Sequence, residues 1–379
     1  MQAKSESQQL ALDTIARKKT RGIPTWLIHI METDLIDEVA GEPAGTYLRQ
    51  PHETYLKMQR NIGVNILDQY LAENPLSMTR RGYDSGTSRG ATTGAEKIVR
   101  DGLEIDSPEA VVEHLERFEF PRLKESIRSL EPEDIRVQAI IKGDQARQDK
   151  LGPTILKTGY GLVALPSLRY TQYGYVDYFS AYALYPEIME RDFALQADRA
   201  VLMNQAAARA VVEGDLPRLC RLDHDMADSR GTLVRTDTLE KIWFPHFRRA
   251  IKPVADIPDM NLIWHCDGNL MSMVPGLLEC GVKGFQGFQY ETGMDYEKIC
   301  AMKTRDGDSL IIIAGVSVTE ALPKGTPDDV RRQMRWLVDN GPKTGLILGG
   351  SSSIAPGTNR ENVLTFIEGL KYYRQHGRM

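Results

Sequence analysis

Two short polar motifs hold the residue types best suited to chemistry. The motif HCDGN (265–269) directly follows the apolar run 261–264, and the motif DHD (223–225) follows the predicted strand 216–222. Imidazole and carboxylate groups act as general acids and bases and also bind divalent cations. Both motifs are therefore candidate parts of a catalytic or metal-binding site.

His265 and Asp267 are separated by one residue, so their side chains point to the same side of an extended segment and could share a metal ion. Glu291, beyond the next predicted strand, is the preferred third ligand. A ligand set that includes carboxylates favours a hard cation or an oxygen-containing ligand. The alternative is a hydrogen-bonded pair that only closes the fold. Cys266, between the two, is expected to point into the packing.

The second motif places His224 between Asp223 and Asp225. We interpret His224 as a general base and the aspartates as orienting carboxylates or additional metal ligands. A solvated turn with one capping aspartate is the alternative.

Six further residues are candidate substrate-binding groups. The arginines and the tyrosine could bind an anionic or aromatic group, although ion pairs and ring packing would explain them equally well. The others lie near the ends of predicted strands. The six residues are Arg169, Tyr170, Arg230, Gln286, Gln289 and Ser352.

The order of the predicted elements favours one parallel barrel. From residue 216 onward strands and helices alternate, which predicts an α/β fold of the (β/α)8 TIM-barrel class for the single domain 1–379. Residues 1–22 are predicted to form an N-terminal arm, and 77–150 an insertion after the second strand. An open doubly wound sheet is the alternative, but the Gly-rich turn of dinucleotide-binding sheets is missing.

Helix signals are clearest at 327–340, where a threonine cap is followed by proline and an apolar stripe. In a parallel barrel the carboxyl ends of all strands meet at one end. We therefore expect six polar residues to gather there, namely Asp68, Asp223, His265, Gln286, Ser317 and Ser352.

Composition excludes several classes of function. The formal net charge of -5 and the lack of a basic stripe argue against a nucleic-acid partner. No apolar run approaches the roughly 20 residues needed to cross a bilayer, and the first residues lack the features of a secretory signal. The four cysteines form no CxxC pair, which suits a reducing compartment, so we expect a cytoplasmic protein without a membrane partner.

The C-terminal half resembles the uroporphyrinogen decarboxylase-like superfamily. The resemblance lies in HCDGN (265–269), PGLLECGVKGFQ (275–286), AGVSV (314–318), LPKGTPDDV (322–330) and APGTNRENV (355–363). This superfamily contains the haem-pathway decarboxylase and methyltransferases that act on corrinoid proteins or coenzyme M. The resemblance implies a single eight-stranded barrel.

Two departures from the superfamily pattern guide the functional interpretation. The equivalent stretch here, WLIHIMETDLI (26–36), lacks the arginines with which the decarboxylases grip substrate carboxylates, leaving Arg169 and Arg230 as the only central candidates. The zinc methyltransferases carry a His-x-Cys pair and a later cysteine. Here those positions are His265, Asp267 and Ser352.

The preferred hypothesis is a metal-assisted methyl (alkyl) transferase that demethylates a small methoxylated substrate. The resemblance implies a divalent metal, with zinc expected first, and a corrinoid carried by a partner protein. A decarboxylase or lyase using His224 and nearby carboxylates is the first alternative, and a non-catalytic small-molecule binder is the second. The sequence leaves the oligomeric state open, with a homodimer as one option.

Overall fold

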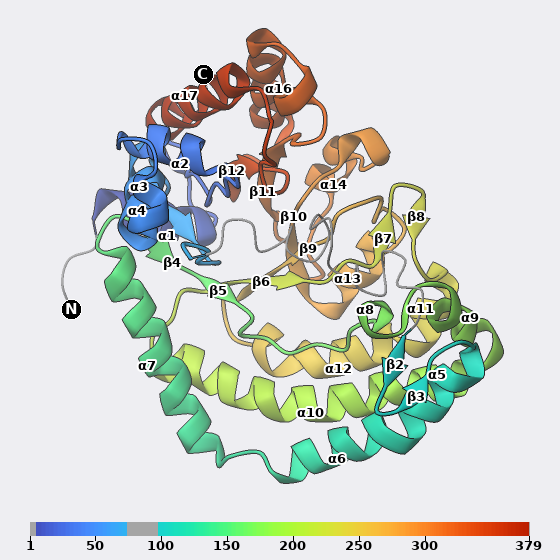
Figure 1. Cartoon of the computed structure of the whole chain (residues 1–379). Helices are drawn as coiled ribbons and strands as arrows, with labels where there is room; N and C mark the ends of the chain where they lie inside the picture. Colours follow the sequence, from blue (N-terminus) through green and yellow to red (C-terminus); the bar gives the residue numbers. More distant parts are fainter. Residues whose placement is uncertain (1–4, 74–97, 379) are drawn as a thin grey trace.

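A curled sheet of parallel strands forms the centre of the protein (Figure 1). The computed structural model describes residues 5–73 and 98–378. Six strands make the largest sheet in the order β12-β11-β10-β9-β6-β5, and all neighbouring strands are parallel. They are β5 (Gly159–Tyr160), β6 (Leu219–Asp223), β9 (Asn261–His265), β10 (Val282–Gln286), β11 (Ile311–Val316) and β12 (Leu346–Gly350).

Short pairings close this sheet into a barrel. Strand β1 (Ile66–Leu67) pairs in parallel with β4 (Leu156–Lys157), and β4 is followed almost at once by β5. The extended segment 24–31 lies between β12 and β1, because Thr25 bridges Leu348 and Trp26 bridges Ile66. The predicted (β/α)8 barrel is thus confirmed, with its first strand reduced to isolated bridges.

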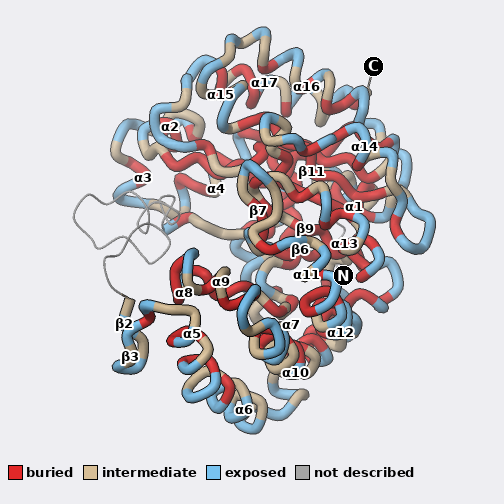
Figure 2. Tube along the Cα trace, turned by 90° about the vertical axis from the view of Figure 1, so that its right-hand side faces the viewer, coloured by how far each residue is buried: buried red, intermediate tan, exposed pale blue. Residues whose placement is uncertain are grey.

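Helices cover the outside of the barrel, as Figure 1 shows. On the described chain they include α2 (Thr33–Ala40), α3 (Thr46–Arg49), α4 (Pro51–Ile62), α10 (Pro186–Glu213), α11 (Thr236–Ile242), α12 (Phe244–Ala255), α13 (Val274–Cys280), α14 (Tyr296–Ala301), α15 (Ala321–Lys324), α16 (Pro327–Asn340) and α17 (Arg360–His376). Helix α16 has the predicted limits, since Thr326 and Asp329 form a capping box. The strands and the inward faces of the helices are buried (Figure 2).

Helix α1 (Glu6–Ile15), within the predicted N-terminal arm, contacts the starts of several strands. Gln8 Nε2 donates a hydrogen bond to the carbonyl oxygen of Ile155, just before β4. Asn261, the first residue of β9, donates to the carbonyl oxygen of Ile15. The helix therefore covers the amino end of the barrel and leaves the carboxyl end for ligands.

The segment predicted as an insertion contains a hairpin and several helices, and its residues 77–97 lie outside the described part. Strands β2 (Val99–Arg100) and β3 (Leu103–Glu104) form the hairpin. The helices are α5 (Pro108–His114), the π-helix η1 (Leu115–Glu119), α6 (Phe120–Arg128) and α7 (Glu133–Leu151). Helix α5 packs on α9 (Val176–Leu184), and α6 and α7 pack on α10. Because β4 follows α7 directly, α7 is the helix that connects the second and third strands.

The carboxyl ends of the strands carry the six polar residues expected there. Asp223, His265 and Gln286 are the last residues of β6, β9 and β10, and the other three follow β1, β11 and β12 within two residues. Since neighbouring strands are parallel, all six lie at one end of the barrel. No helix in the described residues is long and apolar enough to span a membrane.

Asn65 joins the first strand to the second, because its Oδ1 accepts a hydrogen bond from the backbone N–H of Thr25 at 2.9 Å. Asn65→Ala leaves that buried N–H without its acceptor, so we expect the free energy of unfolding to fall by about 1–3 kcal/mol. Urea denaturation measures this loss. The control Lys19→Ala, at an exposed position, should cost about 0.5 kcal/mol or less, and an equal cost for both variants would contradict the role of Asn65 in barrel closure.

Candidate functional site

Arg221 lies inside the barrel next to the carboxyl ends of the strands. Side chains alternate along β6, so Arg221 and Asp223 share one face of the strand. The guanidinium group, only 4% exposed, donates to Asp68 and to Asp223 at 2.7 Å each and to Gln69 at 3.2 Å. Arg221 therefore connects the ends of β1 and β6.

Two aromatic rings enclose the Arg221 guanidinium, whose central carbon lies 5.1 Å from the Trp26 ring centroid and 4.4 Å from that of Tyr160. Burial opposes the charge of Arg221, but the carboxylates of Asp68 and Asp223 outweigh burial and raise its pKa. The Tyr160 hydroxyl also donates to Asp223, and burial together with this carboxylate raises the pKa of Tyr160 to about 12. Arg221 thus stays charged.

Arg221 is therefore a buried cation inside the barrel that the sequence interpretation, which named Arg169 and Arg230 as the central candidates, did not identify. The arginine-x-aspartate spacing in LCRLD (219–223) was the available signal, because period two puts both side chains on one face. An arginine inside an apolar strand requires a buried carboxylate partner, and Asp68 supplies it from a distant part of the chain.

Asp223, Asp225 and His265 form a group that could hold a metal ion, since one ligand atom from each lies within 4.8 Å of the others. The pairing of β6 with β9 places Asp223 beside His265 in register. The backbone N–H of His224 also donates to the carbonyl oxygen of His265 at 3.4 Å. Two carboxylates and one imidazole are a hard donor set that fits a divalent cation.

Asp267 lies beside this group. Its backbone N–H donates to Asp225 Oδ1 at 3.1 Å, and its carboxylate accepts a hydrogen bond from Ser352. Burial raises the pKa of Asp267; His265 and Ser352 oppose the shift, while Asp225 adds to it. Within the described chain, Asp267 Oδ1 and His265 Nδ1 are buried without a hydrogen-bond partner. Buried polar atoms of this kind are expected at a ligand site.

His224 faces the chain rather than an open site. Its Nε2 accepts a hydrogen bond from the backbone N–H of Leu168 at 2.8 Å, which leaves Nδ1 to carry the proton of the neutral ring. Burial lowers the pKa of His224 to about 4, and Asp223 only partly opposes the shift. At neutral pH the ring is uncharged and holds the segment that carries Tyr170. Its role as a general base stays a prediction.

Three residues at or just beyond the end of β10 make polar contacts around this group. Gln289 Oε1 accepts from the backbone N–H of Gly268 at 2.9 Å, and Gln286 Nε2 donates to the carbonyl oxygen of Ser351 at 3.3 Å. Glu291 does not belong to the group of Asp223, Asp225 and His265. Its carboxylate accepts hydrogen bonds from Thr319 and Ser317.

The arginines predicted to bind substrate are both engaged in ion pairs. Arg169 is buried and donates to Asp192 at 2.8 Å and to Glu119 at 2.9 Å. Arg230, with 88% of its side chain exposed, pairs with Asp228 at 2.7 Å. Of the two arginines, Arg230 lines the cavity that lies beside the metal group.

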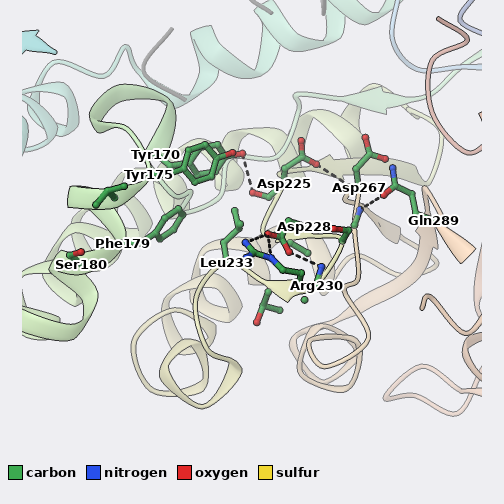
Figure 3. A pocket seen from close by; sticks show the side chains of 16 residues that line it. Tyr170, Tyr175, Phe179, Ser180, Asp225, Asp228, Arg230, Leu233, Asp267 and Gln289 are labelled. Carbon is green, nitrogen blue, oxygen red and sulfur yellow. Dashed lines mark hydrogen bonds and ion pairs between the residues drawn. The ribbon is translucent and has the colours of Figure 1, made fainter. Parts of the chain in front are cut away.

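A cavity of about 1050 Å³ opens beside the metal group (Figure 3). Asp225, Asp267 and Gln289 line one side, and Tyr170, Tyr175 and Phe179 line the other. The Tyr170 hydroxyl donates to the backbone carbonyl of Asp225 at 3.1 Å, which fixes its ring at the cavity wall. Cys266 is 1% exposed, points into the packing as predicted, and does not line the cavity.

Part of the chain matches a known protein family. The model of the uroporphyrinogen decarboxylase (URO-D) family matches residues 223–373, which include both motifs of the candidate site. Over these residues the chain is similar to the uroporphyrinogen decarboxylase family. None of the curated proteins matches its sequence.

Two solved structures are similar to the chain at low sequence identity. A methyltransferase from Methanosarcina mazei is 15% identical, with a TM-score of 0.57, over 97% of this chain and 98% of the other. A protein assigned as a vitamin-B12-independent methionine synthase from Listeria monocytogenes is 14% identical over 93% and 94% of the two chains, with a TM-score of 0.43. The similarity to the Methanosarcina mazei structure supports the barrel fold.

The fold brings together the three positions at which the uroporphyrinogen decarboxylase-like resemblance implies metal ligands. His265 belongs to the metal group, and Asp267 accepts a hydrogen bond from Ser352. Oxygen donors therefore stand at the two positions where the zinc methyltransferases carry thiolates. The site suits a harder cation or an oxygen-containing substrate.

The His224 environment predicts a pH dependence for the metal-free protein. The folded-state pKa of about 4 lies below the usual 6.5, so the unfolded chain binds the proton more readily between these values. The stabilisation by neutral His224 should be complete above pH 6.5 and decrease as the pH falls toward 4. Urea unfolding at several pH values measures this. His224→Gln, which cannot titrate, should show a smaller loss, and an equal loss in both proteins would contradict the assignment.

Proposed function

We propose that the protein is a metal-dependent methyl (alkyl) transferase that moves the methyl group of a small methoxylated substrate to a corrinoid held by a partner protein. The observation that carries this proposal is the hard donor group Asp223, Asp225 and His265 beside a cavity with an aromatic wall. The Methanosarcina methyltransferase indicates that a barrel of this shape can carry methyl transfer.

In such a site, residues on one side of the cavity would bind the metal, and residues on the other side would orient the substrate. Asp223, Asp225 and His265 would hold a divalent cation, zinc being the first to test, with Asp267 beside them. When bound, the cation supplies Lewis acidity to the oxygen that leaves as the methyl group departs. Tyr170, Tyr175 and Phe179 would orient the ring of the substrate.

The charges around the cavity favour this function over decarboxylation. A decarboxylase needs a cation for the substrate carboxylate, whereas the described lining contains Asp225, Asp228 and Asp267 and a single arginine, Arg230. Arg230 is paired with Asp228, and Arg221 is committed to Asp68 and Asp223. A decarboxylase using His224 remains the second candidate, and a non-catalytic binder the third.

Metal binding tests the donor group directly. Asp225→Asn and His265→Ala should each weaken the affinity for Zn²⁺ or Mn²⁺ by at least about tenfold, because each removes a ligand. Isothermal titration of the purified protein after chelation measures this. Glu291→Gln should leave the affinity unchanged. If Glu291→Gln instead weakens binding as much as Asp225→Asn does, the ligand set His265, Asp267 and Glu291 expected from the sequence is the correct one.

Methyl transfer is tested by mixing the metal-loaded protein with methoxylated aromatics and a reduced corrinoid or corrinoid protein. We expect the cobalt absorbance to change as the methyl-corrinoid forms, and the rate to drop at least about tenfold in His265→Ala. Release of carbon dioxide from a carboxylated substrate without that change, abolished by His224→Ala, would favour the decarboxylase. Ligand binding with neither reaction would favour the non-catalytic binder.

A further inference from the structure

The two sides of the cavity differ in chemistry in a way that selects ligands by charge. The cavity lies between α8 (Tyr170–Tyr173) and α9 on one side and, on the other, the ends of β6 and β9 with the hairpin of β7 (Ala227–Asp228) and β8 (Gly231–Thr232). Figure 3 shows the aromatic rings on the α8–α9 side, and Asp225, Asp267 and the Asp228–Arg230 pair across from them.

The aromatic wall is a connected set of rings. The ring centroids of Tyr170 and Tyr175 are 5.2 Å apart with an interplanar angle of 27°, and Tyr170 and Phe179 are 6.0 Å apart at 29°. The ring of His224 continues the stack 6.2 Å from Tyr170. Rings held in this way offer an extended apolar surface on which a planar ring can stack.

The opposite wall is acidic. Asp225, Asp228 and Asp267 contribute three carboxylates, and no lysine lies among the described lining residues. The guanidinium group of the one arginine there, Arg230, donates two hydrogen bonds to Asp228, at 3.1 Å and 2.7 Å. Adding a divalent cation to Asp223, Asp225 and His265 would balance the two ligand carboxylates, yet Asp267 would remain beside it.

The carboxylates of the acidic wall affect the tyrosine hydroxyl groups of the aromatic wall. Burial raises the pKa of Tyr175, and the carboxylates of Asp225 and Asp228 raise it further. Tyr170 stacks on Tyr175 in the same wall. A ring stacked on these tyrosines would therefore lie in the field of the same carboxylates, where a negative substituent is repelled.

We propose that this cavity binds a planar aromatic ring that bears no negative charge, and that the Asp228–Arg230 pair enforces this selection by withholding the only cation among the described lining residues. In the proposed function this ring is the methyl-bearing substrate. Asp228 is the specificity-determining residue, because it adds a carboxylate to the wall and also occupies the guanidinium group of Arg230.

Three probes of equal shape test the selection: 4-methoxybenzyl alcohol, 4-methoxybenzoate and 4-methoxybenzylammonium. With metal-free protein at neutral pH, isothermal titration should show that the ammonium probe binds at least as tightly as the alcohol, and the carboxylate at least about tenfold more weakly than the alcohol. Tyr175→Ala should weaken the ammonium and alcohol probes, which locates binding at the aromatic wall. Equal affinity for the alcohol and the carboxylate would overturn the proposal.

Asp228→Asn tests the named residue. Releasing Arg230 and removing one carboxylate should tighten the carboxylate probe by about threefold to tenfold and leave the alcohol unchanged. Asp237→Asn is the matched control, because Asp237 also pairs with an arginine two residues away, Arg235, on an exposed surface outside the cavity. If both variants change carboxylate affinity equally, or neither does, Asp228 is not the determinant.

These binding measurements separate the inference from the proposed function. Selection against the carboxylate with no methyl transfer to a corrinoid would retain the inference and remove the proposed function. Methyl transfer from 4-methoxybenzoate as fast as from the alcohol would retain methyl transfer and overturn the charge selection.

Discussion

The candidate site depends on the parallel pairing of β6 with β9. This pairing sets Leu219 opposite Asn261 and, four residues later, Asp223 opposite His265. A shift of one residue would move the polar ends to the opposite face, because side chains alternate along a strand. The register is held by apolar residues between those ends, Leu222 and Trp264 among them, which are buried on both strands. Apolar packing directly before the polar strand ends thus fixes the position of the donor group.

Charge balance inside the barrel is the second constraint. Asp223 contributes to the metal group and also accepts a hydrogen bond from Arg221. Arg221 is buried between Trp26 and Tyr160 and compensates Asp68 as well. Removing a single member would leave a buried charge without its partner, which costs far more than a surface ion pair contributes. These residues are therefore expected to act as one unit in stability and in the shape of the site.

The aromatic wall is held from outside the barrel. His114 of α5 contacts the Tyr173 hydroxyl at 2.9 Å, and Glu119 of η1 accepts from Arg169, which in turn binds Asp192 of α10. These contacts fix α8, whose first residue is Tyr170. The segment between the second and third strands thus supports the substrate wall through buried polar contacts, although only α7 within it is needed to connect the barrel strands.

The sequence alone determined the fold class, the limits of helices such as α16, and the gathering of strand ends at one end of the barrel. These features follow from local patterns: apolar runs, helix caps, and the rule that parallel strands end together. It also indicated His265, Asp223 and Asp225 as site residues, because the carboxyl ends of parallel strands are where ligands bind in this fold. Only the tertiary structure decided which carboxylates come within reach of His265. That choice depends on the register of two strands nearly 40 residues apart and on side-chain directions in short loops. It also decided that Arg221 is the central cation and that Arg169 is engaged with Asp192, since a long-range ion pair leaves no mark in the local spacing of either partner.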